Sequence, residues 1–438
     1  MSIIQASIPL FFILIGVELL YQRASGARLY RLNDAISDLS LGTLSQLMGV
    51  FFKVVTLGLY IVVAERFAVQ RYFPVTDWPD GAPFYALGGF PWFGVNAIPL
   101  LSWAVVFTLV DYAYYWSHRM SHEVHVLWAG HVVHHSSEEY NLAVALRQTA
   151  LGGLMTWVFY IPLAVLGVPW TMFVTCNAIN LVYQFWIHTR AVGKLGSLSE
   201  FILNTPSHHR VHHAVNLQYI DQNYAGVFIV WDRLHGTFVE EQEEPVYGLT
   251  HPLASWNPLW ANLHVFVEIW QLARRTSGWG NKLKVVFGPP SWRPTDVPPA
   301  VEGPLFTVDN HRLYDPVVRP GVNWYAATQF VIVTVAAVKV LALASALPLA
   351  QTFALAFYLT LGLTTIGGLL EGERWGYVLE QARLISLAAA AGTLLVTGRV
   401  PAGWAGSALV LFVLSAIWLR AVAGRDGGPS DEAQPAVT

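Results

Sequence analysis

The chain has 438 residues, of which 54% are hydrophobic and only 12% are charged, against the roughly 25% charged content of soluble domains. This composition indicates an integral membrane protein. A formal net charge of −3 argues against nucleic acid as a partner, because proteins that bind nucleic acid carry an excess of basic residues. The single cysteine, Cys176, excludes an intrachain disulfide and a four-cysteine iron–sulfur site. Any electrons must therefore come from another protein or an organic reductant.

Apolar runs near the roughly 20 residues needed to cross a bilayer recur along the chain. They lie at residues 3–20, 39–64, 97–116, 149–166, 168–187, 323–345, 348–368, 384–398 and 402–419. These runs predict an all-α integral membrane protein with about nine transmembrane helices. Only the short sequence Gly167-Val168-Pro169 separates the fourth run from the fifth. The two are expected to form a hairpin that returns to the side of the membrane it left.

Basic residues flank these runs unevenly. The clusters are Arg23, Arg28 and Arg31 after the first run, Arg274, Arg275, Lys282 and Lys284 after the fifth, and Arg420 and Arg425 after the last. The positive-inside rule makes all three regions cytoplasmic, which an odd number of spans with an outside N-terminus satisfies. Arg66 and Arg71, on the predicted outer side, count against this topology. Residues 117–148 and 188–322 would then form a helical cap on the cytoplasmic face.

Two segments of this cap are read separately. Trp256 to Trp270 is aromatic and amphipathic and precedes basic residues, which fits a helix in the membrane interface and equally a buried core helix. Residues 273–322 are rich in proline, glycine and charge, which predicts a polar connection. It would join an N-terminal part, 1–272, to a C-terminal transmembrane bundle, 323–424, and residues 425–438 would form a disordered tail.

Eleven of the fifteen histidines fall between His118 and His213, in repeated spacings. His118 and His122 are four residues apart, which places both rings on one face of a helix. The sequence H-x2-H-H occurs twice and H-x3-H once, with one further histidine between the copies. The nine positions are His118, His122, His131, His134, His135, His188, His209, His212 and His213. All lie on the same predicted side of the membrane.

Neutral imidazole binds iron, zinc and copper better than calcium or magnesium. Nine imidazoles exceed the ligands that one ion can use, so two metal ions are the economical interpretation. An ordinary polar role is favoured for the histidines outside the spacing, and His208 is placed behind the ligands. Those outside the spacing are His125, His235, His251, His264 and His311.

The motifs HRMSH, HVVHH and HRVHH, with an additional histidine in YQFWIHT, resemble the histidine boxes of the fatty acid hydroxylase and sterol desaturase superfamily of membrane di-iron oxygenases. The stretches WAGHVVHHSSEEYNLAVALRQ, LNTPSHHRVHH and NYAGVFIVWDRLHGTF are more narrowly similar to its alkylglycerol monooxygenase branch. The resemblance is strongest over about residues 100–240. In the C-terminal part, LEGERW is the one recognisable phrase.

This resemblance implies an oxidoreductase: a mixed-function monooxygenase with two non-haem iron ions, held by the nine histidines, and dioxygen as co-substrate. In the alkylglycerol branch the attacked carbon is the first of an ether-linked alkyl chain, and the hydroxylated product falls apart into a fatty aldehyde and a glycerol derivative. That branch takes its electrons from tetrahydrobiopterin, whereas sterol and fatty acyl relatives use cytochrome b5 or a ferredoxin-type donor. The expected partners are a membrane, a lipid substrate and, in the second case, an electron-donor protein.

Four residues are candidates for supporting catalysis. Ligating histidines usually pass their second ring proton to a carboxylate or carbonyl, so Glu123, beside His122, and Gln184, one turn before His188, are well placed. Asp111 is an ionisable residue in an apolar run, which usually faces a protein interior or a cavity. Asn223 follows the last motif in a family-like Asn-Tyr pair, for which ordering the helix is a sufficient role. Glu138, Tyr140, Asn141 and Arg147 follow the second motif, and either a headgroup or pterin contact or a plain surface role fits them.

Three other functions remain to be compared. A sterol, fatty acyl or carotenoid hydroxylase or desaturase would use the same site, because substrate placement decides between these outcomes. A metal transporter would need acidic residues and histidines inside several spans, and after the third run there are almost none. A membrane zinc protease would need H-E-x-x-H, whereas the chain offers only His122-Glu123-Val124-His125.

Overall fold

The computed structural model describes residues 3–69, 72, 97–298 and 312–423. The described residues are helical apart from their connecting loops and one isolated β-bridge between Ala214 and Tyr247, as the all-α prediction expects. They divide into two compact units. Unit 1 comprises residues 1–30, 48–252 and 262–311, and unit 2 comprises residues 31–47, 253–261 and 312–438, in each case as far as they are described.

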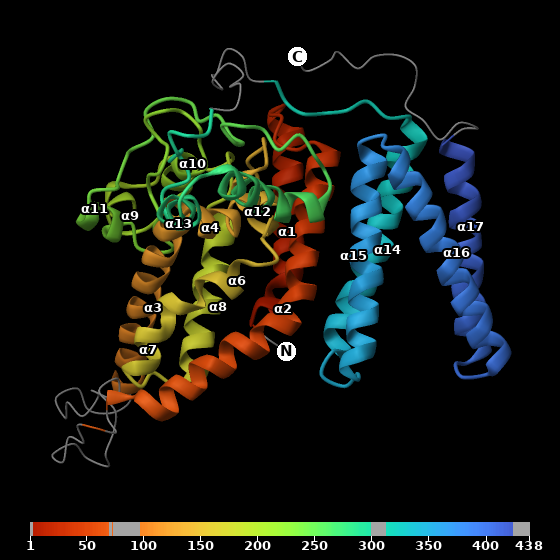
Figure 1. The fold of residues 1–438 in the computed structure, drawn as a ribbon, viewed down its shortest axis with the longest axis horizontal. Helices are drawn as coiled ribbons and strands as arrows, with labels where there is room; N and C mark the ends of the chain where they lie inside the picture. Colours follow the sequence, from red (N-terminus) through yellow and green to blue (C-terminus); the bar gives the residue numbers. More distant parts are fainter. Residues whose placement is uncertain (1–2, 70–71, 73–96, 299–311, 424–438) are drawn as a thin grey trace. The chain divides into compact units, whose positions relative to one another are not determined.

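Unit 1 combines long helices with short ones (Figure 1). The long helices are α1 (Ile3–Ser25), α2 (Leu32–Phe67), α3 (Ala97–Glu123), α8 (Trp170–Trp186) and α12 (Pro258–Arg275). The short helices include α4 (His125–Ala129), α5 (Val132–His135), α6 (Gly152–Thr156), α7 (Ile161–Val165), α9 (Ser197–Ile202), α10 (Pro206–His212), α11 (Val230–His235) and α13 (Trp279–Phe287), with 3-10 turns η5 (Val144–Leu146) and η6 (Trp157–Tyr160). Helices α2 and α12 contribute residues to both units.

Helices α3 and α8 pack against each other through an apolar core. Val106 and Val110 of α3 and Cys176 of α8 are fully buried in it. The Tyr60 hydroxyl of α2 donates a hydrogen bond to the carbonyl of Val168 at 2.9 Å, just before α8 begins. This packing brings the C-terminal ends of α3 and α8 to the same end of the unit as α4 and α10 (Figure 1).

Local sequence signals explain where the short helices begin. Thr205 caps α10, exchanging hydrogen bonds with His208, and Pro206 occupies the first turn, where no backbone N–H donor is needed. Gly167 has φ +76°, a left-handed conformation that glycine adopts freely, and it turns the chain between α7 and α8. The predicted turn at Gly167-Val168-Pro169 is therefore present.

Unit 2 contains a bundle of four helices: α14 (Pro320–Leu343), α15 (Leu349–Leu370), α16 (Arg374–Thr397) and α17 (Ala402–Ala423). Glu380 of α16 is completely buried and accepts hydrogen bonds from Tyr325 of α14 at 2.9 Å and Thr365 of α15 at 2.6 Å. Arg383 pairs with the same carboxylate at 2.7 Å. Polar groups inside an apolar bundle are costly unless paired, so this network specifies how three helices meet.

Six described helices are long and apolar enough to cross a membrane: α1, α2 and α14 to α17. They coincide with six of the nine predicted spans and identify a multi-pass membrane protein. The other three runs are also helical. Residues 97–116 lie in α3; 149–166 are broken into α6, η6 and α7; and α8 has 17 residues, at the lower limit for a span.

The segment predicted as a polar connection, 273–322, contains the helix α13, which its composition did not indicate. Helix α12 covers most of the amphipathic segment 256–270 and is partly buried. His264, Val265 and Ile269 are buried on one face, while Leu263 and Trp270 are exposed on another. The predicted tail, 425–438, lies outside the described residues.

Candidate metal centre

The nine histidines of the repeated spacing lie on four segments of unit 1. The last turn of α3 carries His118 and His122. Helix α5 carries His134 and His135, with His131 as the residue preceding it. His188 lies two residues beyond α8, and α10 carries His209 and His212, with His213 as its C-cap.

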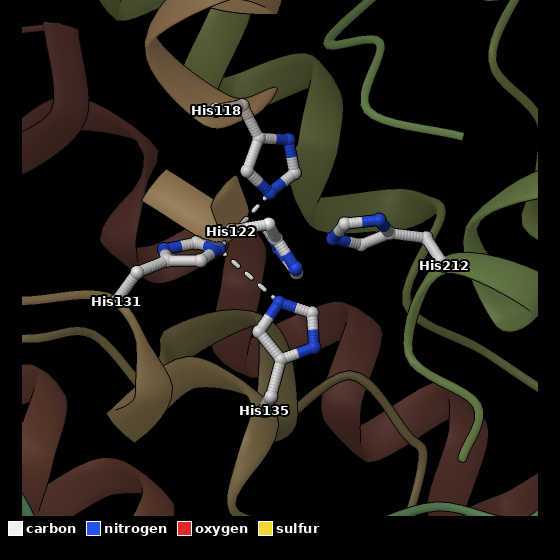
Figure 2. A group of neighbouring side chains, drawn as sticks. All are labelled: His118, His122, His131, His135 and His212. Atoms are coloured by element: carbon white, nitrogen blue, oxygen red, sulfur yellow. Dashed lines mark hydrogen bonds between the residues drawn. The ribbon is translucent and has the colours of Figure 1, made fainter. Parts of the chain in front are cut away.

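The nine rings form two groups. The first consists of His118, His122, His131, His135 and His212, and the second of His134, His188, His209 and His213; within each group the potential ligand atoms lie within 4.8 Å of one another. Figure 2 shows the five rings of the first group pointing toward a common centre. Within it, His131 Nε2 lies 3.0 Å from His118 Nε2 and 3.1 Å from His135 Nε2.

The two groups are direct neighbours. His134 and His135 are consecutive in the chain but belong to different groups. The His135 and His213 rings, one from each group, stack with their centroids 4.4 Å apart. In the second group, His188 Nε2 lies 3.0 Å from His209 Nε2 and 3.2 Å from His134 Nε2. The arrangement therefore offers two adjacent metal positions.

One loop orients three rings of the first group. The carbonyl of Tyr224 accepts a hydrogen bond from His118 Nδ1 at 2.7 Å, and the carbonyl of Gln222 accepts one from His212 Nδ1 at 2.9 Å. The Asp221 carboxylate lies 3.4 Å from His122 Nδ1. Because a carbonyl oxygen only accepts, the Nδ1 atoms of His118 and His212 carry the proton and their Nε2 lone pairs face the centre.

Backbone carbonyls also orient the second group. His134 Nδ1 donates to the carbonyl of Arg147 at 3.0 Å, and His188 Nδ1 donates to the carbonyl of Gln184 at 2.7 Å. Arg147 is itself buried and donates from Nε to the carbonyl of Val133 at 2.9 Å and to the Ser136 hydroxyl at 3.1 Å. These hydrogen bonds hold α5 in place and account for the buried position of Arg147 without a surface role or a contact with a headgroup or pterin.

The donor atoms fit metal ions. Among the described residues, the buried Nε2 atoms of His122, His212 and His213 have no hydrogen-bond partner, an arrangement that is costly unless a ligand is bound there. Nitrogens about 2.1 Å from an ion span about 4.2 Å across it, close to the 4.8 Å limit of each group. Burial lowers the pKa of His134 to about 4 and holds the pKa of His131 well below its usual value. Both of these rings are therefore kept in the neutral form that binds metal.

Asp111 and Gln184 belong to a chain of hydrogen bonds behind His188. Asp111 accepts from the Trp231 indole and the Val227 amide, both at 2.8 Å, and from the Asn180 side chain at 2.5 Å. Asn180 in turn accepts from the Gln184 side chain at 2.6 Å. The contact of Gln184 with His188 runs through its backbone carbonyl, not its side chain. Asp111 thus reaches the centre only through other residues.

Asn223 holds the loop that contacts the first group. It has φ +57°, a left-handed conformation that asparagine tolerates better than most residues. Its side chain donates to the carbonyls of His208 at 3.1 Å and Val239 at 2.7 Å, and accepts from the Val239 amide at 2.8 Å. Asp232, which the sequence did not single out, accepts from the amides of Tyr224 and Ala225 at 2.8 Å.

Glu123 lies elsewhere than expected. Its carboxylate pairs with Arg119 at 2.8 Å and its side chain is 39% exposed. The acid next to His122 is instead Asp221, which follows the last histidine motif in the sequence. A support role for Glu123 stays a prediction.

The remaining histidines that the structure describes lie outside both groups. His125 bonds to the carbonyl of Val285, His235 packs against Tyr115, and His208 pairs with Glu200 at 2.9 Å. His251 is exposed, His264 is buried in α12, and His311 lies outside the described residues.

Sequence reasoning missed Glu18 of α1, which is buried. It accepts hydrogen bonds from Thr189, next to His188, and from the Leu142 amide. An acid within the first apolar run was the available signal, the same signal that marked Asp111.

A model of the fatty acid hydroxylase family matches residues 103–237, which contain all nine histidines. The alkylglycerol monooxygenase of Xenopus tropicalis is 36% identical over 379 residues, which cover 86% of this chain and 79% of that protein. The chain belongs to the fatty acid hydroxylase family, in its alkylglycerol monooxygenase branch. Human alkylglycerol monooxygenase is 45% identical over 264 residues, 60% of this chain and 54% of the human protein, so this match spans about half of the human protein.

The ornithine lipid hydroxylase OlsE of Rhizobium tropici is also similar, with 31% identity over 148 residues, which cover 32% of this chain and 42% of that protein. No solved structure is significantly similar.

Proposed function

We propose that the chain is a membrane di-iron monooxygenase that hydroxylates the carbon next to the ether oxygen of alkylglycerols and so releases a fatty aldehyde and a glycerol derivative. The observation that carries this proposal is the pair of adjacent histidine groups, five and four rings, with unpartnered Nε2 atoms at their centres. The similarity to alkylglycerol monooxygenases over 86% of the chain supports this substrate class.

The nine histidines would hold the two irons. When bound, the irons would use dioxygen and a pair of electrons to place one oxygen atom in a C–H bond and release the other as water. The resulting hemiacetal carries a hydroxyl and the ether oxygen on the same carbon. It breaks the bond to the ether oxygen, which leaves as the glycerol hydroxyl, and becomes the aldehyde. The protein's contribution is to place one carbon beside the metals.

Asp111, Gln184 and Asn223 act as positioning residues in this proposal. Asp111 and Gln184 fix the end of α8 next to His188, and Asn223 fixes the loop whose carbonyls orient His118 and His212. Glu123, paired with Arg119, is proposed to hold the last turn of α3.

The electron donor is proposed to be tetrahydrobiopterin, with cytochrome b5 or a ferredoxin as alternatives. The proposed topology has nine spans, with α3, the α6–α7 segment and α8 crossing beside the six long apolar helices, and with the metal centre on the cytoplasmic side. The basic clusters after the first, fifth and last runs support that side.

A second candidate function within the same site is hydroxylation or desaturation of another lipid, such as a sterol, fatty acyl chain or carotenoid. The similarity of residues in this chain to an ornithine lipid hydroxylase supports this candidate. A metal transporter is disfavoured because the histidines gather in one buried centre and do not line several spans.

The decisive experiment supplies the purified full-length protein with a long-chain alkylglycerol, oxygen and reduced tetrahydrobiopterin, and measures fatty aldehyde. We expect aldehyde from the ether and none from the matching acylglycerol ester. His212→Ala should abolish the product, whereas His251→Ala, at an exposed histidine outside both groups, should not. Hydroxylation of a sterol, carotenoid or fatty acid with a protein donor, and no turnover with the pterin, would move the chain to the second candidate function.

Metal analysis tests the centre independently of the substrate. Protein purified under anaerobic, iron-replete conditions should carry close to two irons per chain. Active protein with one iron or none would refute the dinuclear centre. Zinc in an aerobic preparation would not, because imidazole sites bind zinc more tightly than ferrous iron.

A further inference from the structure

Helix α13 presents an exposed apolar stripe. Trp279, Leu283 and Phe287 follow one another at intervals of four residues, so they lie along one side of the helix, and their side chains are 81%, 56% and 62% exposed. Exposed aromatic and aliphatic residues on one helix face indicate a surface that something apolar covers. This helix lies outside the long apolar spans, so the bilayer core does not account for the stripe.

The opposite side of α13 is fixed to the segment between the first two histidine motifs. Val285 is buried, and its carbonyl accepts a hydrogen bond from His125 Nδ1 at 2.9 Å. The His125 amide donates to the carbonyl of Gly288 at 2.9 Å. His125 opens α4 and lies three residues after His122. The orientation of α13 is therefore set by a direct attachment beside the metal centre (Figure 1).

Basic residues are frequent in the sequence segment that carries the stripe. Residues 268–296 contain five basic residues, Arg274, Arg275, Lys282, Lys284 and Arg293, and two acidic residues, Glu268 and Asp296, a net charge of +3, whereas the whole chain has −3. Arg274, Arg275 and Lys284 are exposed. Lys282 donates to the carbonyl of Ala273 at 2.6 Å. The basic excess is thus concentrated next to the apolar stripe.

Helix α12 also has an exposed apolar side. Leu263 and Trp270, seven residues apart and so on a similar face, are exposed, and the Arg274 guanidinium lies 4.9 Å from the Trp270 ring centroid. Tryptophan at the level of the headgroups, apolar residues below it and basic residues beside it are typical of helices that lie in the membrane interface.

We propose that α13, together with the exposed side of α12, binds the surface of an anionic lipid bilayer. The Trp279, Leu283 and Phe287 side chains enter the interface, and the exposed basic residues contact anionic headgroups. The basic excess favours this occupant over a protein with a basic surface and over a second copy of the same segment, because like charges repel. The attachment through His125 then holds the first histidine motif at the membrane edge.

Site-directed fluorescence tests this surface in the full-length protein. Leu283→Cys and the control Asn281→Cys would each be made with Cys176→Ser, labelled with an environment-sensitive dye and reconstituted in vesicles. Asn281 is exposed on the side of α13 away from the stripe. We expect the dye at 283 to be quenched by nitroxide lipids and protected several-fold from iodide relative to 281, and more so with phosphatidylglycerol in the phosphatidylcholine vesicles than without it.

Two results would overturn the proposed contact with the membrane. One is equal access of iodide to positions 283 and 281 in both kinds of vesicle. The other is protection of 283 that arises only when a soluble protein is added, which would make α13 a protein-docking surface. A membrane contact that does not respond to phosphatidylglycerol would overturn the anionic preference. Because Leu283 is exposed, its replacement leaves the core of unit 1 intact, and dye readings do not depend on enzyme activity.

Discussion

Backbone carbonyl oxygens orient four of the nine histidines. In the first group, His118 donates from Nδ1 to the carbonyl of Tyr224, and His212 to that of Gln222. In the second group, His134 donates to the carbonyl of Arg147, and His188 to that of Gln184. The spacing of the histidines in the sequence indicated that the rings of each motif share a helix face, because residues three and four apart do so, whereas the structure divides the rings of both H-x2-H-H motifs between the two groups. It did not predict these carbonyl partners, since every residue has a carbonyl and its direction depends on the fold.

Asn223 offers a test of this orientation. Asn223→Ala should lower iron content and activity, because it leaves the buried carbonyl of His208 and the half-buried carbonyl of Val239 without this donor, at a cost of about 1–3 kcal/mol for a buried group left unsatisfied. It also places alanine at φ +57°. Asn223→Gly, which adopts that φ freely, should lose less thermal stability than the alanine variant. Full iron occupancy in Asn223→Ala would show that the loop does not depend on this side chain.

The buried rings also predict how the centre responds to acid. Burial lowers the pKa of His134 to about 4 and holds the pKa values of His209 and His213 well below the usual one. The neutral, metal-binding form thus persists at pH values where free imidazole, with a pKa of about 6.5, is protonated.

We therefore expect iron to be retained as the pH falls from about 7 to about 5 and released closer to the pKa of about 4 given for His134. In the iron-free protein, unfolded histidines take up protons below about pH 6.5 while the buried ones do not, so the free energy of unfolding falls as the pH falls. Iron analysis after dialysis measures the first effect. Half-release near pH 6.5 would mean that the rings are solvated.

At the level of elements, α3, α8 and the loop after Asn223 meet at Gly226. A Cβ atom there would lie 2.8 Å from Tyr114 Cδ1, 2.9 Å from Asn180 Oδ1 and 2.9 Å from Asp111 Oδ1. The glycine allows the loop to approach both helices closely enough for Asp111 to accept from the Val227 amide. The sequence indicated that Asp111 faces a protein interior or a cavity, because an ionisable residue in an apolar run usually does. The sequence could not predict that its partners include backbone amides and an indole.

Gly226→Ala should therefore disturb the contact between α3, α8 and the loop. We expect a loss of about 1–3 kcal/mol of stability, the usual cost of overpacking, with lower iron content because Asp111 and Asn180 support the segment before His188. Gly193→Ala is the matched control, since a Cβ there meets nothing within 4 Å. Thermal unfolding in detergent and iron analysis provide the comparison. Equal stability of the two variants would show that the loop can move away without cost.

Hydropathy predicted that residues 149–166 are apolar and helical, but not that the helix is broken. The structure divides them into α6, η6 and α7. Gly152, Gly153 and Pro162 lie in this segment, and glycine and proline weaken a continuous helix. A hydropathy value averaged over a window of residues does not resolve these breaks. Sequence therefore predicted the all-α class and the long helices well, and the shorter spans only as apolar runs.

At the scale of the whole molecule, membrane topology decides whether all four histidine segments can reach one centre. Unit 1 brings the ends of α3 and α8 together with α5 and α10, and so places all nine rings at one end. In a membrane this requires the segments 117–148 and 188–252 to share one face. The basic clusters predict that this face is cytoplasmic.

Cysteine labelling checks this topology, because Cys176 is the only native cysteine and is buried. In a Cys176→Ser background, a membrane-impermeant reagent added from the cytoplasmic side should modify Leu195→Cys and Leu217→Cys, both exposed in the structure. Reagent added from outside should modify Tyr72→Cys, exposed beyond the end of α2, because α2 would carry the chain across the bilayer. Labelling of positions 195 and 217 from outside would reverse the proposed orientation, and labelling of all three positions from one side would exclude α2 as a span.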